Sequence, residues 1–490
     1  MAGLTSSLMI GLSGLRTHQE VLNVIGHNIS NADTPGYSRQ KASIVSANSQ
    51  EFGNFMFGAG SNLSNIQAVR DRFLNLQIAG SMTKQAGAET RFSTMEAISP
   101  VFSESGEANL GFLVQKFFQG FQDLTARPED QSVRTALISQ ANSMIGGIQS
   151  RYTMLRDQRI SADDSIGVMV TQINTLTTQI AKLNLRISNE PTPGADNDAR
   201  DQRNEIVNQL STLVGVQTFE DSNSLMTVVV DGAPAPLVAG TVSFQMTTTK
   251  DPANSNYLKV EVQLGSPVDI TGLRGGILGG KLDVRDTLLL GIQQKLDQLA
   301  AGIQGEVNLA HRAGYALDGA TTNLDFFQTG VANGADGLPV TISAGTNYVG
   351  MVNAWSVNAA IVTAPSLIGA AAAPGRVGDN TQAKVIANLQ FKANSVDTNG
   401  DAVGDSGPFS TYVGIIIGSI GSQTREYQTT NTTEQNLLQA LQSQRDRVSG
   451  VSLDEEAADL MIMQRGYQAS ARFISVIDQL TEQLVNQFGR

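Results

Sequence analysis

The sequence predicts a mostly α-helical protein with inserted β structure, in which a long helical bundle is built from both chain termini. Three observations support this fold class. Both ends of the chain carry apolar residues at heptad spacing. Residues 65–214 show mainly helical periodicity. The middle of the chain changes to β-branched runs separated by Gly, Pro, Asn and Asp, which predict a small antiparallel β domain and a mixed, irregular outer region inserted between helices.

The first segment, residues 1–64, is expected to be an N-terminal assembly helix followed by an extended segment. Its apolar stripe consists of residues spaced one heptad apart and of neighbours on the adjacent row: Leu8, Leu15, Leu22, Ile25 and Ile29. Gly11 and His18 complete the adjacent row. A single helix of this kind is marginal in water, so we expect it to pair with the other chain end and with neighbouring copies.

A turn is predicted to end this helix in the stretch NISNADTPGYSRQ, residues 28–40. Pro35 disfavours helix at Thr34, and Pro35-Gly36 suits the centre of a type II turn, where glycine accepts a positive φ. Asparagine side chains can hydrogen-bond the backbone freed at the helix end. The candidate turn residues are Asn28, Asn31, Thr34, Pro35, Gly36 and Tyr37. We expect this turn to set the angle between the terminal helix and the rest of the chain.

The interior is expected to divide where the periodicity changes. An isoleucine row from Ile166 to Ile187 indicates a helix of the subunit's own bundle. The Ala- and Gly-rich outer region is expected to hold minor β structure and one short helix near 380–392. The predicted segments are a helical bundle at 65–214, an inserted antiparallel β domain at 215–275, a long helix returning to the bundle at 276–315, the mixed outer region at 316–405, and the C-terminal bundle and assembly helices at 406–490.

The C-terminal segment mirrors the N-terminus. Ser449-Gly450 is predicted to separate two helices, because glycine is the usual helix terminator. The second helix starts at a capping box in which Ser452 and Glu455 each satisfy a free backbone N–H. Its predicted assembly residues follow the heptad spacing: Leu460, Met463, Tyr467, Ile474, Ile477, Leu484 and Phe488.

Composition limits the function. The net charge of −12 argues against nucleic acid as a partner, because phosphate binding requires a basic surface. The absence of cysteine excludes disulfides and thiolate metal sites. No apolar run approaches the length of a membrane span, so membrane insertion is not expected. The first residues lack the positive region of a secretory signal peptide, so export is expected to use another route.

No motif indicates catalysis, a cofactor or a metal, and we expect that the protein is not an enzyme. The stretch GGILGGKL at 275–282 fits a phosphate-binding loop except that Leu282 replaces the required Ser or Thr. The stretch DTNGDAVGD at 397–405 is similar to a calcium loop but lacks the turn glycine and the bidentate Glu. A nucleotide-binding enzyme that uses the first stretch, or a secreted adhesin that uses the β domain, are the alternatives from other functional classes.

Two long stretches carry a family resemblance. LNVIGHNISNADTPGYSRQ resembles the N-terminal signature of the bacterial flagellar axial proteins, which are the rod, hook and hook-associated proteins. SGVSLDEEAADLMIMQRGYQASARFISVIDQLTEQLVN resembles their C-terminal signature. Two interior stretches, DARDQRNEIVNQLSTLVGV and LRGGILGGKLDVRDTLLLG, are similar to hook-associated members of the family.

The resemblance implies a structural component that forms the junction ring between hook and filament and assembles through coiled-coil-like terminal helices. Another flagellar axial protein, hook-like or hook-associated, is the alternative. The resemblance also implies a role in motility, type III export without a cleaved signal peptide, and an extracellular location in the flagellum. The implied partners are other copies of the chain, the hook protein, a second hook–filament junction protein, and a cytoplasmic export chaperone on the C-terminal helix.

Overall fold

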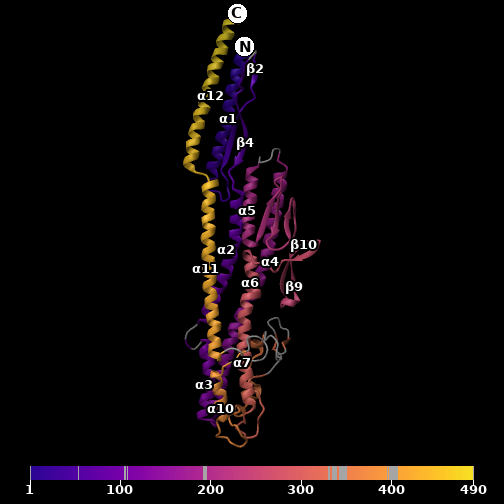
Figure 1. The fold of residues 1–490 in the computed structure, drawn as a ribbon, viewed down its shortest axis with the longest axis vertical. Helices are drawn as coiled ribbons and strands as arrows, with labels where there is room; N and C mark the ends of the chain where they lie inside the picture. Colours follow the sequence, from indigo (N-terminus) through magenta and orange to yellow (C-terminus); the bar gives the residue numbers. More distant parts are fainter. Residues whose placement is uncertain are drawn as a thin grey trace.

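The protein is an elongated helical rod, and both chain ends lie at the same end of it (Figure 1). The computed structural model describes residues 2–488 except 53–54, 104–105, 107–108, 191–195, 329–331, 334–338, 341–349, 394–395 and 397–406. The predicted fold class is confirmed: long helices follow the rod axis, and small antiparallel sheets lie on one flank. Within the described parts of the chain, no helix has the length and apolarity that a bilayer crossing requires.

At the end of the rod where both termini lie, residues 2–68 form one helix and two pairs of antiparallel strands. The helix α1 (Ala2–Ser30) is the predicted assembly helix. The strands that follow are β1 (Gln40–Ser46), β2 (Gln50–Phe52), β3 (Phe55–Phe57) and β4 (Ser61–Ala68). β1 pairs antiparallel with β4, and β2 with β3. Thr17 donates to the Ser61 carbonyl, while Ser13 accepts from the Ser61 N–H. The extended segment predicted here is therefore a hairpin that lies along α1.

Long helices form the body of the rod. They are α2 (Arg72–Phe102), α3 (Leu110–Ala126), α4 (Gln131–Ser188), α5 (Asn197–Leu213), α6 (Gly276–Asp283), α7 (Leu289–Arg312), α11 (Phe409–Ser449) and α12 (Leu453–Phe488). Several begin behind an Asp or Asn whose side chain accepts a hydrogen bond from the first turn, as Asp71 does from Leu74 and Asp130 from Ser132. A π-helical turn, η3 (Val284–Leu288), joins α6 to α7.

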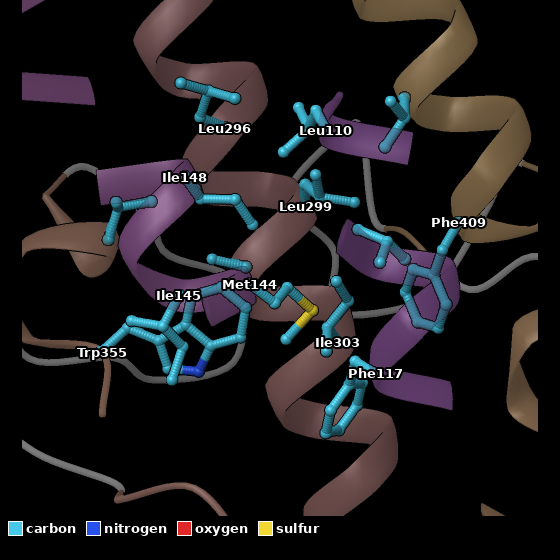
Figure 2. Packing of buried hydrophobic residues seen from close by; sticks show 14 of the residues in the cluster. Leu110, Phe117, Met144, Ile145, Ile148, Leu296, Leu299, Ile303, Trp355 and Phe409 are labelled. Carbon is cyan, nitrogen blue, oxygen red and sulfur yellow. The ribbon is translucent and has the colours of Figure 1, made fainter. Parts of the chain in front are cut away.

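The half of the rod far from the chain ends has an aromatic core. Phe117 on α3 packs edge-on against Phe121, with ring centroids 5.5 Å apart, and Phe118 stacks on Phe409 of α11. Met144 and Ile148 of α4 face Leu299 of α7 across the same core (Figure 2). These side chains are almost completely buried. Helices distant in sequence are therefore held together by hydrophobic burial.

The inserted β structure lies beside α4 and α5 (Figure 1). Its strands are β5 (Val216–Glu220), β6 (Met226–Val230), β7 (Pro236–Ala239), β8 (Val242–Ser243), β9 (Met246–Asp251), β10 (Tyr257–Leu264) and β11 (Ser266–Asp269). They form one sheet in the order β5-β6-β7-β8 and another in the order β11-β10-β9. Ile166, Ile173 and Ile180 are fully buried in the core shared with these strands. The isoleucine row therefore holds the β domain as well as the helices.

The outer region contains short helices and little strand pairing. The helices are α8 (Met351–Ala354), α9 (Ala359–Thr363), η4 (Pro365–Leu367), α10 (Thr381–Asn388) and η5 (Leu389–Phe391). The short helix expected near 380–392 is confirmed. Among the residues described here, strand pairing is limited to β12 (Ala332–Asn333) with β13 (Pro339–Val340) and two isolated bridges. The calcium-like stretch at 397–405 lies outside the described residues.

The glycines of the stretch GGILGGKL serve helix packing. Gly276 begins α6 with a φ of +71°, and the following residues are helical. A Cβ on Gly280 would lie 2.8 Å from Thr90 of α2, so only glycine allows this close approach of the two helices. Because the stretch is a packed helix and not a loop after a strand, the phosphate-loop interpretation is wrong.

His311 of α7 is buried, and its two hydrogen bonds fit the neutral imidazole. Its Nδ1 lies 2.6 Å from the Leu324 carbonyl oxygen, and its Nε2 accepts from the Gly369 N–H at 2.9 Å. The first contact requires a proton on Nδ1, and the second requires a free lone pair on Nε2. Burial lowers the pKa of His311 to about 4. The imidazole therefore holds the outer region to α7 only while it is uncharged.

We expect the free energy of unfolding to lose about 3 kcal/mol through His311 as the pH falls from 6.5 to 4, because the unfolded chain takes up the proton first. Burial raises the pKa of Asp297 to about 7, and this carboxyl acts with the opposite sign, losing stability as the pH rises from about 4 to 7. Urea unfolding of wild type and His311→Gln at several pH values separates the two groups. The difference between the two curves should shrink as the pH falls, and a constant difference would contradict the prediction.

Candidate assembly interface

The two chain ends form an antiparallel helix pair. α1 and α12 lie side by side over most of their length at one end of the rod (Figure 1). Small residues bring the helices together: a Cβ on Gly11 would lie 2.8 Å from Ile474, and one on Gly466 would lie 2.7 Å from the His18 ring. The predicted row of Gly11 and His18 therefore faces the other chain end, and the expected pairing of the termini is confirmed.

The residues predicted for assembly lie mainly along this pair. On α1, Ile25 is buried and Leu8, Leu15 and Leu22 are half-buried, while Ile29 is 36% exposed at the edge. On α12, Ile477 is buried, and Leu460, Met463, Tyr467 and Ile474 are half-buried. Leu484 is 40% exposed beyond the paired part, and the Phe488 side chain lies outside the described residues. The fold therefore uses most of the predicted stripe within one chain.

α12 carries a second apolar strip, which α1 touches along one edge at Gly466 and Phe473 and otherwise leaves exposed. We call this the open strip. Successive residues of the strip are four and three positions apart in turn, and they are Ile462, Gly466, Ala469, Phe473, Val476 and Leu480. Ile462 is 59% exposed and Val476 is 52% exposed. The spacing is that of a coiled-coil seam, so the strip has the form of a surface for a further helix.

The NADTPGY stretch makes the predicted turn. The Tyr37 N–H donates to the Thr34 carbonyl at 3.2 Å, and Gly36 has a φ of +82°. This combination defines a type II turn with Pro35 and Gly36 at its centre. Asn31 donates from its side chain to the His27 carbonyl and so satisfies the end of α1, as expected.

Asn28 has a different role from the one predicted for it. Its Oδ1 accepts from the Gln40 N–H and from the Tyr37 hydroxyl, while its Nδ2 donates to the Gln40 carbonyl and to Glu456. All four hydrogen-bonding positions of the amide are therefore used inside the protein, where the residue is 1% exposed. Burial raises the pKa of Tyr37, and the nearby carboxylates Asp198, Asp201 and Glu456 raise it further, so this hydroxyl remains a donor.

Arg39 joins the turn to the start of α12. Its Nε donates to Glu456 at 2.6 Å, and its Nη1 lies 2.5 Å from Glu455. Its backbone N–H donates to the carbonyl of Ser449, the last residue of α11. The predicted capping box is therefore only half formed: Ser452 Oγ accepts from the Glu455 N–H at 3.5 Å, but the Glu455 carboxylate binds Arg39.

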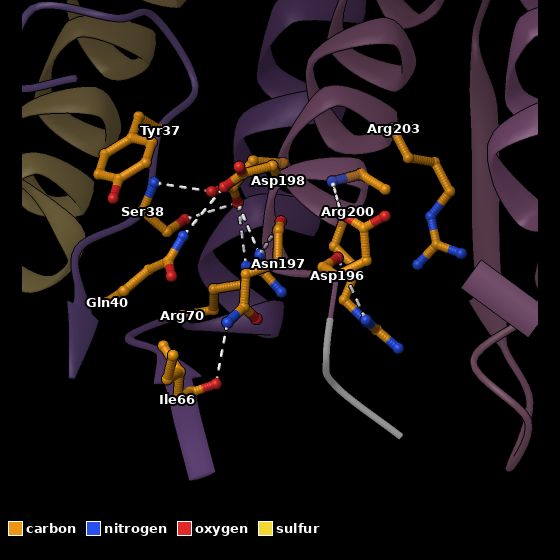
Figure 3. Close-up of polar contacts among 12 residues, drawn as sticks. Tyr37, Ser38, Gln40, Ile66, Arg70, Asp196, Asn197, Asp198, Arg200 and Arg203 are labelled. Atoms are coloured by element: carbon orange, nitrogen blue, oxygen red, sulfur yellow. Dashed lines mark hydrogen bonds and ion pairs between the residues drawn. The ribbon is translucent and has the colours of Figure 1, made fainter. Parts of the chain in front are cut away.

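The same turn is attached to α5. Ser38 donates from both its N–H and its hydroxyl to Asp201, which also accepts from Arg70. Gln40 donates to Asp198 at 2.9 Å (Figure 3). Arg445 of α11 donates to the Tyr37 carbonyl. We call residues 28–40 and 449–456, with these contacts, the elbow; here α1, α5, α11 and α12 meet.

The polar half of the elbow was not predicted from the sequence. Ser38 and Arg39 lie inside the stretch that was singled out, but no role was predicted for them. Asp201 and Glu456 are more than 160 residues away from Ser38 or Arg39, at separations of 163 and 417. In the sequence, the acidic run at 454–456 is typical of a helix N-terminus, where the helix dipole stabilises it, and it indicates no distant partner. The sequence offers one signal for this contact. Arg39 lies in the N-terminal stretch that resembles the family, and the oppositely charged run at 454–456 lies in the C-terminal one.

The glycine contacts give a prediction for the helix pair. Gly466→Ala should lower the free energy of unfolding of the α1–α12 pair by about 1–2 kcal/mol, because the added methyl overlaps the His18 ring. Gly26→Ala is the matched control, since no heavy atom lies within 4 Å of its added Cβ, and it should stabilise α1 by up to about 1 kcal/mol. Amide exchange of α1 and α12 measures both changes. Effects of the same sign in the two variants would show that the glycine contact does not control the pairing.

Three family models match the chain. The model "Flagella basal body rod protein" matches residues 8–37, which include most of α1 and the turn. The model "Flagellar basal body rod FlgEFG protein C-terminal" matches residues 442–487, which include all of α12 except its last residue. The model "Flagellar hook-associated protein FlgK helical domain" matches residues 95–327. The two shorter matches therefore contain residues 28–37 and 449–456 of the elbow but not residues 38–40, and the longest contains most of the bundle and the β domain.

Full-length relatives agree with these models. Flagellar hook-associated protein 1 of Salmonella typhimurium and that of Escherichia coli are each 28% identical, over 99% of this chain and 100% of the relative. The Bacillus subtilis protein of the same name is 24% identical, over 97% of this chain and 96% of the relative. The fold resembles that of the flagellar hook junction protein FlgK from Burkholderia pseudomallei, with a TM-score of 0.65 at 17% identity, over 76% of this chain and all of that one.

These matches are to structural proteins of the flagellum, and they leave no support for the enzyme alternative. The terminal models, the helical-domain model and the relatives agree over nearly the whole length of the sequence. Over nearly its whole length, the chain is therefore similar to proteins named flagellar hook-associated protein 1, and three flagellar family models match its two ends and its helical middle.

Proposed function

We propose that this protein forms the junction between the hook and the filament, as a ring of copies that contact one another through the terminal helix pair. The observation that carries the proposal is the open strip of α12, which remains exposed although α1 already occupies the neighbouring face. An exposed apolar row of this length is unfavourable in water unless a partner covers it. The matched relatives are named as hook-associated or hook junction proteins.

The finer assignments rest on the same reasoning. The hook protein would lie on one side of the ring and a second junction protein on the other. A cytoplasmic export chaperone would cover the apolar surface of α12 before export, because this surface would otherwise promote aggregation. Export would proceed through the flagellar type III channel without a cleaved signal peptide, and the assembled protein would be extracellular. Assembly residues on α1 and α12 and the turn at Pro35-Gly36 would act together in the ring.

Localisation tests the proposal. An antibody raised against the β domain, residues 216–269, avoids the helices that would be covered in the ring. On isolated flagella it should label one band at the boundary of hook and filament. Labelling along the whole hook would indicate a hook-like axial protein, and the absence of labelling on flagella would reject the axial role. Intact cells without flagella provide the control for a surface adhesin, because an adhesin would label them too.

A further inference from the structure

The open strip of α12 has a defined extent and chemistry. It runs from Ile462 to Leu480, which is about 27 Å of helix at 1.5 Å per residue. Phe473 is 43% exposed and Leu480 is 44% exposed, whereas Ile477, on the face toward α1, is 8% exposed. α1 is the element that packs along α12. Gly466 and Phe473 border the contact with α1, at His18 and Gly11, and the rest of the strip points away from α1 and is free for a second helix.

A matching row exists on α1. Leu8, Leu15, Leu22 and Ile29 extend over about 31 Å by the same rise. They are half-buried at the edge of the helix pair, with Ile29 exposed at 36%. The hairpin covers a different side of α1, where Ser13 and Thr17 bond to Ser61. One flank of this leucine row is therefore accessible along its length.

The two rows lie on opposite faces of the helix pair. At about 100° per residue, the α1 row lies about 60° to one side of the line joining the helices, a line marked by the contacts of Gly11 with Ile474 and of Gly466 with His18. The middle of the open strip lies about 80° from the same line, with Gly466 and Phe473 on the side nearest α1. Viewed from one end of the pair, both rows are rotated in the same sense from this line. Because the two helices face each other, this rotation places the two rows on opposite faces of the pair.

We infer that the open strip of each copy receives the Leu8–Ile29 row of α1 from the next copy. This inference rests on the proposed function and names the partner surface within it. In a ring whose axis follows the rod, the incoming α1 is antiparallel to α12, as in the pair within one chain. Rows on opposite faces allow each copy to use one row on each neighbour, which is the heterologous contact that a ring requires. Pairing of two open strips with each other would be isologous and would end at a dimer.

Cysteine cross-linking can test the contact because the natural chain has no cysteine. Single-cysteine variants Leu8→Cys, Leu15→Cys and Leu22→Cys are each co-produced with Ala469→Cys, and the two chains carry different epitope tags. Each chain has one thiol, so a disulfide-linked species with both tags can arise only between copies. Gln468→Cys is the matched control, since it is also exposed but does not belong to the strip.

Isolated flagella are oxidised, and the fraction of doubly tagged dimer is measured. We expect at least one α1 position to link to Ala469→Cys at least tenfold more than to Gln468→Cys. Equal yields with the two α12 positions, or no dimer in flagella whose junction is labelled by the β-domain antibody, would overturn the inference and leave the proposed function intact. If the antibody does not find the chain at the junction, the proposed function fails and the inference fails with it. Melting curves of the variants confirm that each is folded.

Discussion

Replacing Glu456 by alanine is expected to detach the terminal helix pair from the bundle, at a cost of about 3–5 kcal/mol in local stability. The Glu456 side chain is 2% exposed, and its two oxygens accept from Arg39 at 2.6 Å and from Asn28 at 3.0 Å. Removal of one partner leaves a largely buried guanidinium and a buried amide without their shared acceptor. The other contacts of Asn28 hold Gln40 and Tyr37, so the loss should spread through the elbow.

Glu455 provides a control within the same ion-pair group. Its side chain is 64% exposed and it also contacts Arg39, so Glu455→Ala should cost less than about 1 kcal/mol. Amide exchange of residues 2–30 and 453–488 reports the detachment, while α3 and α4 should keep wild-type protection in both variants. Glu456→Gln, which retains an acceptor for Asn28, should fall between the two. Equal exchange in Glu456→Ala and Glu455→Ala would show that the buried carboxylate has no special role.

The local parts of the fold were predictable because local sequence determines them. Pro35-Gly36 encodes a type II turn through two backbone preferences, and the turn forms as expected. Gly450 ends α11, and the heptad rows identify α1 and α12. The pairing of β1 with β4 was not predicted, since it depends on which side of α1 is left for the hairpin. Such long-range pairing has no signature in a short window of sequence.

The candidate interface was predictable in part, for a similar reason. A heptad template assigns one seam to a helix, and the seam it found on α12 is the one that α1 covers within the chain. The open strip follows the same spacing from Ile462 onward. The sequence alone does not distinguish it from the first seam, because the distinction depends on which face of α12 packs against α1. The contact of Glu456 with Arg39 could not be predicted from local sequence, because the two residues are 417 positions apart.

The elbow links the two uses of the terminal helices. α12 follows α11 after three residues, 450–452, and α1 is followed by the turn, so the chain itself constrains the helix pair at two points. Between them, Arg39 and Asn28 bind Glu456, and Ser38 binds Asp201 of α5. The direction of the pair relative to the bundle is therefore set by buried polar contacts, which require defined geometry. A surface that must meet an identical copy benefits from such a fixed direction.

Replacing Val476 by aspartate is expected to leave the monomer folded and to abolish incorporation into the flagellum. Val476 is 52% exposed on the open strip, so its effect on monomer stability should stay within about 0.5 kcal/mol. In the ring the carboxylate would be buried without a partner, at a cost of several kcal/mol for each contact between copies. Labelling of isolated flagella with the β-domain antibody measures incorporation, and Gln464→Asp, an exposed position off the strip, should incorporate normally.

The adjacent residue makes the test decisive. Ile477 is 8% exposed and faces α1, so Ile477→Asp should lower the stability of the monomer itself, by about 4 kcal/mol or more. The two neighbouring substitutions thus separate the face used within the chain from the face used between copies. If Val476→Asp destabilised the monomer as much as Ile477→Asp, the open strip would belong to the fold of the single chain. If Val476→Asp were incorporated normally, copies would contact one another through some other surface.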